Sequence, residues 1–150
     1  MMQPVTNEFA GEQEMGLPRD QLEVQFHTEV NISSSDFDCC AFLDHRRNQY
    51  SFSAIIKYLE EYLPTVDSKV LAVTGLDLYI PALTCVFGEA RLHGQCAVVS
   101  SCRLDNKFYG LPDNPSLLQE RLLKEGIHEL GHTFGLSHCH HPDCVMKSST

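Results

Sequence analysis

The chain has 150 residues, of which 43% are hydrophobic, so it holds enough apolar material for one compact domain but would be marginal for two. Its net charge of -9 and its eleven scattered Lys and Arg residues, of which only Arg46 and Arg47 are adjacent, argue against nucleic acid as a partner. No apolar run approaches the roughly 18 to 20 residues of a membrane span, and the N-terminus resembles no secretion signal, so we expect a cytoplasmic protein without membrane contact.

Two segments in the first half of the chain have regular patterns of apolar residues. Over residues 22–32 apolar side chains fall at even positions, which favours a strand, although Leu22 and Phe26 would also share a helix face. Over residues 51–62 apolar side chains recur at helical spacing, and Pro64 follows. The sequence therefore predicts a helix that ends before Pro64.

Four short segments rich in β-forming residues follow in the middle of the chain. They are residues 70–73, 78–80, 85–87 and 96–100, separated by Gly75, Pro81, Gly88 and Gly94. We expect these segments to be strands of one sheet.

A second helix is predicted to begin near Ser116, because Gln119 three residues later gives the spacing of a capping box. An apolar stripe of helical period runs along it, made of Leu118, Leu122, Leu123, Ile127, Leu130 and Phe134. The predicted metal-binding motif begins on this helix.

The tract HELGHTFGLSH occupies residues 128–138. Residues four apart on a helix share a face and lie about 6 Å apart along the axis, so His128 and His132 can direct both imidazoles at one ion. Glu129 is rotated by about 100° from His128, which suits a base that acts on bound water. Gly135 can end the helix in the left-handed conformation and let the chain return with His138 as third ligand. Three neutral imidazoles leave a fourth position for water, so the sequence predicts a catalytic zinc site.

The next residues, CHHPDCVM at 139–146, extend the tract to the pattern HExxHxxGxxHCxxxxCxM with every fixed position present. In this pattern the chain resembles the archaemetzincins, a family of zinc metallopeptidases within the metzincins. The stretches VTGLDLYI (73–80), VFGEA (86–90) and AVVSS (97–101) are similar to strands of that family. The likeness covers most of residues 48–146.

The resemblance implies an α+β fold of the metzincin type, close to α/β, with a twisted mixed β-sheet, a long zinc-binding helix and a Met-turn formed by Met146 beneath the metal. It also implies that residues 95–101 form the edge strand along which an extended peptide pairs. Residues 1–150 are then expected to be a single metallopeptidase domain that stops soon after the Met-turn.

The same resemblance implies a second zinc ion, held by Cys139 and Cys144 together with two cysteines of a later CxxC. No CxxC follows Cys144 in these 150 residues, so half of that ligand set is missing. Three outcomes stay open for Cys139 and Cys144: an empty site, a disulfide bond, or a site completed by His140 or His141. The odd number of cysteines, seven, favours free thiols and metal ligands over a disulfide framework.

The sequence therefore predicts a zinc-dependent metallopeptidase that acts on peptide or protein substrates, with zinc held by His128, His132 and His138 and the attacking water activated by Glu129. One alternative is a catalytically silent, zinc-containing module that binds peptides or acts as a scaffold, and the intact Glu129 argues against it. A second alternative is a purely structural zinc, although such a site usually has four protein ligands.

Overall fold

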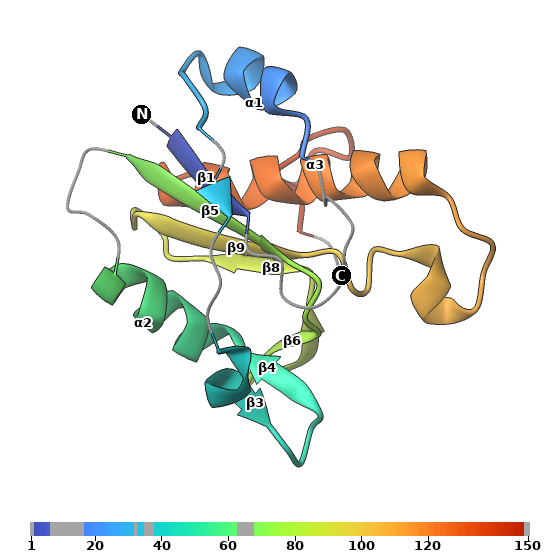
Figure 1. Cartoon of the computed structure of the whole chain (residues 1–150). Helices are drawn as coiled ribbons and strands as arrows, with labels where there is room; N and C mark the ends of the chain where they lie inside the picture. Colours follow the sequence, from blue (N-terminus) through green and yellow to red (C-terminus); the bar gives the residue numbers. More distant parts are fainter. Residues whose placement is uncertain (1, 7–16, 32, 35–37, 63–67, 149–150) are drawn as a thin grey trace.

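The computed structural model describes residues 2–6, 17–31, 33–34, 38–62 and 68–148 (Figure 1). The elements in chain order are β1 (Met2–Thr6), α1 (Arg19–Phe26), β2 (Ser33–Ser34), the 3-10 helix η1 (Cys39–Phe42), β3 (Leu43–Asp44), β4 (Gln49–Ser51), α2 (Phe52–Tyr62), β5 (Lys69–Thr74), β6 (Leu78–Ile80), β7 (Leu83–Val86), β8 (Gly88–Ala90), β9 (Cys96–Ser100), the 3-10 helix η2 (Asn106–Tyr109) and α3 (Pro115–Thr133). The described residues thus combine helices and strands in the α+β class predicted from the sequence.

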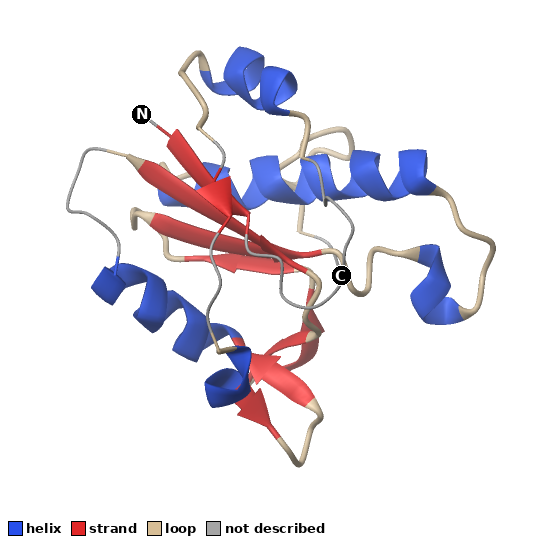
Figure 2. Ribbon diagram, viewed as in Figure 1, coloured by secondary structure: helices blue, strands red, loops and turns tan. Residues whose placement is uncertain are grey.

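The strands form two sheets, so the prediction of one sheet was wrong. The larger sheet has the order β2-β1-β5-β9-β8, and the smaller has the order β3-β4-β6-β7. In the larger sheet β2, β1, β5 and β9 are parallel neighbours, whereas β8 is antiparallel to β9. Figure 2 shows the smaller sheet below the larger one. The local pattern found four strands correctly but carries no information about partners, and β6 pairs with β4 rather than with β5.

The central strands β5 and β9 are buried on both faces, and each face belongs to a different core. One core contains Val70, Ala72, Cys96 and Val98 and packs against α2. The other contains Leu71, Val73, Ala97 and Val99 and packs against α1 and α3. In Figure 1 α2 lies below the sheet, and α1 and α3 lie above it. Because side chains alternate along a strand, such double burial produces the continuous apolar runs of the sequence.

The helix predicted over residues 51–62 is confirmed as α2, which begins one residue later. Its buried side chains are Phe52, Ile55, Ile56 and Leu59. At its start the Ser51 hydroxyl accepts a hydrogen bond from the Ala54 N–H at 3.3 Å, which satisfies one of the free donors of the first turn. Pro64, which the sequence placed after this helix, lies outside the described residues.

The N-terminal strand predicted around Leu22 was wrong, because that segment is the helix α1. Leu22 is 1% exposed, whereas Val24, which would share its face in a strand, is 73% exposed. Phe26, one helical turn after Leu22, stacks on Phe134 at the end of α3, with 5.7 Å between ring centroids. The helical spacing of Leu22 and Phe26 therefore indicated the structure correctly, whereas the alternation of apolar residues with a period of two did not.

The interior position of β9 contradicts the expectation that residues 95–101 form an edge strand. All five residues of β9 are buried between β5 and β8. The pattern of β-forming residues had treated Gly88 as a separator, but Gly88 begins the strand β8, which lies within the stretch 86–90 that resembles a strand of the family. Among the described strands β8 is hydrogen-bonded to β9 alone, so β8 is one of the two edges of the larger sheet, and β2 is the other.

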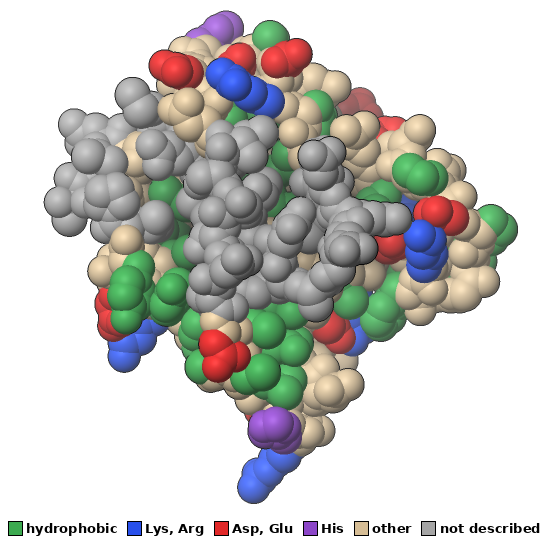
Figure 3. All heavy atoms as spheres, in the orientation of Figure 1, with side chains coloured by type: hydrophobic (Ala, Val, Ile, Leu, Met, Phe, Trp, Pro, Cys, Tyr) green, Lys and Arg blue, Asp and Glu red, His purple; other side chains and the backbone are tan. Residues whose placement is uncertain are grey.

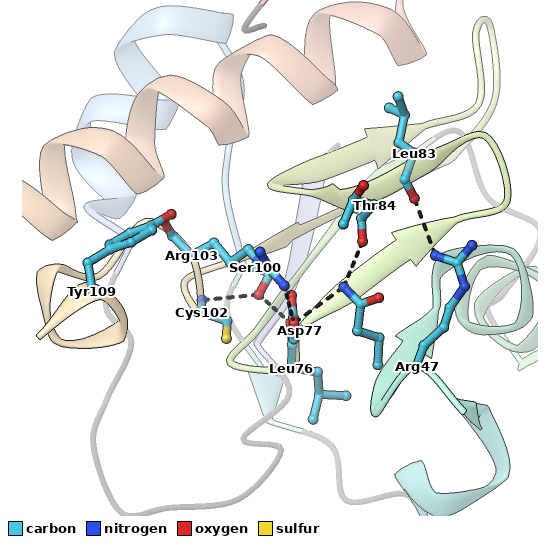
Figure 4. A network of polar contacts seen from close by, with 10 residues as sticks. Arg47, Leu76, Asp77, Leu83, Thr84, Ser100, Cys102, Arg103 and Tyr109 are labelled. Atoms are coloured by element: carbon cyan, nitrogen blue, oxygen red, sulfur yellow. Dashed lines mark hydrogen bonds and ion pairs between the residues drawn. The ribbon is translucent and has the colours of Figure 1, made fainter. Parts of the chain in front are cut away.

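An ion pair between Asp77 and Arg103 connects the smaller sheet to the chain that follows β9 (Figure 4). The Arg103 Nε and Nη2 atoms donate to the two carboxylate oxygens of Asp77 at 2.7 and 2.8 Å. Gln49 of β4 donates to Asp77 at 3.3 Å and to the Thr84 carbonyl at 2.8 Å. The Tyr109 hydroxyl donates to the Arg103 carbonyl at 2.9 Å, so this tyrosine belongs to the same network. A two-pronged pair of this kind fixes orientation as well as distance.

The surface shown in Figure 3 carries Lys and Arg side chains in separate spots rather than in one patch. The basic side chains are thus scattered over the visible face of a chain whose net charge is -9. None of the helices in the described part of the chain combines the length and the apolar character that crossing a membrane requires.

The helical structure of α1 can be tested by comparing two alanine substitutions. Leu22→Ala should lower the free energy of unfolding by about 2–5 kcal/mol, because it empties a buried site. Val24→Ala should change it by less than about 0.5 kcal/mol, because the side chain is exposed. Urea unfolding followed by circular dichroism measures both. Equal losses in the two variants would contradict the helix and favour a strand with both side chains on its buried face.

Candidate metal centre

Helix α3 begins at Pro115, with Asn114 as its N-cap. The Asn114 side-chain oxygen accepts a hydrogen bond from the Leu117 N–H at 3.1 Å. Proline at the first helical position costs the helix no hydrogen bond, because the N–H that proline lacks would have no partner inside the helix. The helix predicted to begin near Ser116 is therefore confirmed, but Asn114 rather than Ser116 caps it.

The apolar stripe predicted on α3 is confirmed from Leu118 to Leu130 and packs on β5 and β9, whereas Phe134 lies just beyond the helix and is 51% exposed. Leu122 and Leu130 are buried, and Leu118, Leu123 and Ile127 pack against the same core. A Cβ at Gly126 would lie 3.1 Å from the Leu71 side chain, so this glycine allows a close approach of helix to sheet. The metal-site residues of α3 are therefore held on a rigid support.

The last turn of α3 ends in the left-handed glycine conformation expected from the sequence. Gly135 has φ +90, its N–H donates to the His132 carbonyl at 2.9 Å, and the Leu136 N–H donates to the Gly131 carbonyl at 3.0 Å. These two bonds are those of a Schellman motif, which satisfies carbonyls at a helix end. A Cβ at Gly135 would also collide with the His93 ring.

The three predicted histidines lie together. Their ligand atoms all lie within 4.8 Å of one another. The ring centroids are 4.7 Å apart for His128 and His132, 5.2 Å for His128 and His138, and 4.9 Å for His132 and His138. Among the described residues this is the one group of three or more His, Cys, Asp or Glu side chains with metal-site spacing.

Two backbone carbonyls fix the orientation of two of the rings. The Nδ1 atoms of His128 and His132 lie 2.7 Å from the carbonyl oxygens of Val145 and Leu136. A carbonyl only accepts, so each Nδ1 carries the proton, and each neutral ring keeps its lone pair on Nε2. Sequence reasoning missed both carbonyls, because any residue type supplies one.

The arrangement of the two Nε2 atoms fits a zinc ion. They lie 3.1 Å apart, and two lone pairs at this distance repel unless a cation lies between them. Two nitrogens around tetrahedral zinc, at bond lengths of about 2.0–2.1 Å, are about 3.3 Å apart. The donor set and its spacing are therefore those that zinc requires.

The electrostatic surroundings favour neutral imidazoles. Burial lowers the pKa of His128; the hydrogen bond to the Val145 carbonyl opposes this shift, and the charge of His132 adds to it. Desolvation and the neighbouring His132 and His128 lower the pKa of His138. Only the neutral ring binds a metal ion, so both shifts keep these side chains in the ligand form at lower pH than usual.

The Glu129 side chain is 5% exposed and lies against β8. A Cβ at Gly88 would lie 2.9 Å from the Glu129 Cγ and 2.9 Å from the Val98 carbonyl oxygen. Gly88 therefore leaves the space in which the Glu129 side chain lies. No sequence pattern indicated this contact.

Two further carboxylates gather at Glu129, and sequence reasoning missed both. Glu125 lies one turn earlier on α3 and hydrogen-bonds to Glu129, and Glu89 lies on β8. Burial, followed by the charges of Glu125 and Glu89, raises the pKa of Glu129 to about 9. Burial also raises the pKa of Glu89, while the neighbouring His132 opposes that shift. This group of Glu89, Glu125 and Glu129 is called the carboxylate cluster below.

Met146 packs directly under the histidine-bearing part of α3. It is 6% exposed, and its sulfur lies 2.5 Å from the place where a Cβ on Gly131 would stand. The Met146 carbonyl accepts a hydrogen bond from the Cys139 N–H at 2.9 Å. Glycine inside a helix costs about 1 kcal/mol against alanine, and here the close approach of Met146 explains it.

Cys139 and Cys144 are half-buried free thiols, and the other five cysteines of the chain are free thiols too. The backbone N–H of His141, followed by a side-chain hydrogen bond from Cys144, lowers the pKa of Cys139. The two thiols are therefore neighbours, but within the described residues they belong to no group of three metal-ligating side chains. A second zinc site at these cysteines stays a prediction.

A twisted mixed sheet, a long helix with three convergent histidines at its end, and a methionine beneath them define a metzincin-like zinc peptidase fold. The family model of Peptidase family M54 matches residues 29–150. The chain therefore belongs to Peptidase family M54, and its similar proteins are archaemetzincins, as the sequence pattern had implied.

Among its relatives, the archaemetzincin of Methanocaldococcus jannaschii is 48% identical over 103 residues, which are 69% of this chain and 55% of the relative. The archaemetzincin of Archaeoglobus fulgidus is 40% identical over 124 residues, 83% of this chain and 70% of the relative. The chain spans little more than half the length of most of the first curated relatives that it matches.

Solved structures show the same fold. The crystal structure of archaemetzincin from Methanopyrus kandleri has a TM-score of 0.80 and 36% identity, covering 99% of this chain and 82% of that one. A zinc-dependent peptidase from Methanocorpusculum labreanum has a TM-score of 0.77 and 29% identity, covering 97% of this chain and 87% of that one.

The role of Gly135 can be tested against a second glycine of positive φ. Gly135→Ala should weaken zinc binding about tenfold or more, because the added Cβ meets His93 in the turn that leads to His138. Gly110→Ala, at φ +71 with open space around it, should cost about 1–2 kcal/mol of stability and keep the affinity. Competition with a chromophoric chelator measures the affinity. Equal affinities in both variants would contradict the importance of the turn.

Proposed function

We propose that this protein is a zinc-dependent metallopeptidase that hydrolyses peptide bonds in peptide or protein substrates. His128, His132 and His138 hold the zinc ion, and Glu129 activates the attacking water. The observation that carries this proposal is the convergence of three imidazoles within 4.8 Å. Residues 1–150 act as one peptidase domain, because the two cores share the strands β5 and β9.

When bound at the three histidines, zinc lowers the pKa of a water molecule and polarises the scissile carbonyl. Glu129 accepts a proton from the attacking water while the water oxygen bonds to the carbonyl carbon. The same carboxyl group then delivers the proton to the departing amine. Burial of Glu129 against β8 keeps this proton from bulk water between the two transfers.

The edge strand β8 provides the place where an extended substrate pairs. The N–H of Ser100 donates to the Phe87 carbonyl at 2.7 Å, so residue 87 directs its backbone groups toward β9. Antiparallel pairing alternates along a strand, and the backbone groups of Gly88 and Ala90 therefore point to the open side. An added peptide strand can form main-chain hydrogen bonds there.

The alternative function is a catalytically silent, zinc-containing module that binds peptides along β8 or acts as a scaffold. The edge strand would serve such a module equally well. A binding module needs no base, however, and it gains nothing from burying the carboxylate of Glu129 at the cost of its desolvation. The location of Glu129 therefore favours the peptidase.

The peptidase mechanism is tested by Glu129→Gln, which keeps the shape of the side chain but removes its proton acceptor. Turnover of a peptide library should fall by about 10²–10⁴-fold, the usual contribution of a general base, while the zinc content stays unchanged. Glu120→Gln, an exposed substitution on the same helix, is the matched control and should keep full turnover. Retained turnover in metal-replete Glu129→Gln would refute the assignment. Peptide binding by the wild type without any turnover would favour the silent module.

The ligand assignment is tested by elemental analysis of protein purified without added zinc. We expect about one zinc per chain in the wild type, lost in His132→Ala and retained when Cys139 and Cys144 are both replaced by Ser. About two zinc ions, of which the double serine variant loses one, would mean that the cysteines complete a second site. A folded wild type that takes up no zinc would refute the proposed function.

A further inference from the structure

The side chain of Lys69, at the start of β5, lies at a meeting point of several elements outside the metal site. Its Nζ donates to the Gly94 carbonyl at 2.8 Å and to the Thr133 carbonyl at 2.9 Å. The same atom lies 5.2 Å from the centroid of the Phe134 ring, whose other partner is Phe26 of α1. One half-buried ammonium group thus contacts the end of α3 and the hairpin between β8 and β9.

The two carbonyls that Lys69 binds are next to residues that contact each other. Gly94 follows His93, and Thr133 follows His132. The His93 N–H donates to the His132 carbonyl at 3.0 Å, and the His93 ring fills the space beside Gly135. Lys69, the hairpin and the last turn of α3 therefore form a closed ring of contacts.

The charge of Lys69 suits this position. The last carbonyls of a helix carry the negative end of its dipole, and a cation there is stabilising. An ammonium group has three donors and no acceptor, so it can hold two carbonyls of different elements at once. A neutral side chain of the same length would leave two partly buried carbonyls without this donor.

We propose that Lys69 is a positioning residue for the metal centre. It holds the last turn of α3 against the β8–β9 hairpin, and thereby fixes the ring of His132 and the turn at Gly135 from which His138 emerges. This inference rests on the proposed zinc site and extends it to a cation that touches neither the metal nor the substrate.

The contacts of the ligands explain why this effect should reach the metal. The His132 ring is oriented by the Leu136 carbonyl, which lies just beyond the turn, at 2.7 Å. A shift of the last turn therefore moves the His132 ring together with the Leu136 carbonyl that orients it. The same shift changes the course of the chain that leads to His138. Lys69 acts on ligand geometry through the backbone rather than through a bond to a ligand.

The test compares Lys69→Met and Lys69→Arg with Lys124→Met, all loaded with cobalt(II) in place of zinc. Lys124 lies on the exposed face of α3 and pairs with Glu120, so it is the matched control. Lys69→Met should release cobalt to a chelator about tenfold faster than the wild type. Loss of a residue that hydrogen-bonds directly to a metal ligand typically lowers metal affinity about 10 to 100-fold, and the effect of Lys69 should lie at the lower end of that range. The visible absorption of Lys69→Met should shift, because these bands report the geometry around cobalt. Lys69→Arg should restore most of the release rate, and Lys124→Met should match the wild type.

A merely structural role gives a different result. If Lys69→Met lowers the unfolding temperature of the metal-free protein but leaves the cobalt spectrum and the release rate unchanged, the inference is overturned. If Lys69→Met does not fold, Lys69→Gln, whose amide can still donate to one carbonyl, carries the same comparison. A wild type that binds no cobalt or zinc would instead refute the proposed function itself.

Discussion

The position where α3 stops is the constraint on which the metal centre depends. Two of the imidazoles lie on the helix and the third lies beyond it, so they converge only if the chain reverses within a few residues. The left-handed Gly135 and the two hydrogen bonds of the last turn provide that reversal. The carbonyl of Leu136, exposed by the same turn, then orients the His132 ring. One backbone conformation thus places the third imidazole and fixes the orientation of a second.

The larger sheet supplies the rigidity that this turn requires. Strands β5 and β9 are buried on both faces, and α3 lies on them through Leu122, Leu130 and the close approach at Gly126. Met146 closes the other side of the histidine-bearing segment by occupying the space next to Gly131. Close-packed contacts of this kind transmit small displacements rather than absorb them. The glycines at positions 126 and 131 are therefore part of the metal centre, although neither has a side chain to contribute.

Sequence patterns predicted the parts of the site that depend on spacing along one element. His128 and His132 follow from helical geometry, and Gly135 follows from the need for a left-handed residue before His138. The parts that depend on pairing between distant segments were missed or wrong. β9 was expected at an edge because the family resemblance implied it, and its run of β-forming residues is compatible with an edge or an interior strand. The pattern of β-forming residues did not separate β8 from β7, because β8 is three residues long and begins with glycine. The carbonyl partners of the rings were invisible, since a carbonyl belongs to every residue type.

The carboxylate cluster and the histidines are best understood as one electrostatic unit. Burial disfavours the charged forms of Glu89, Glu125 and Glu129, and the charge of a neighbouring carboxylate adds to this effect at Glu125 and Glu129. Neighbouring carboxylates are costly in a low dielectric unless a positive charge lies close to them. Imidazoles that served as neutral ligands would not supply that charge, whereas a cation held at their Nε2 atoms would. A divalent ion at that position would offset the repulsion in the cluster and lower the pKa of Glu129 toward the range in which it accepts a proton. In the proposed mechanism, the ion at the three histidines would therefore also make the buried carboxylate usable as a base.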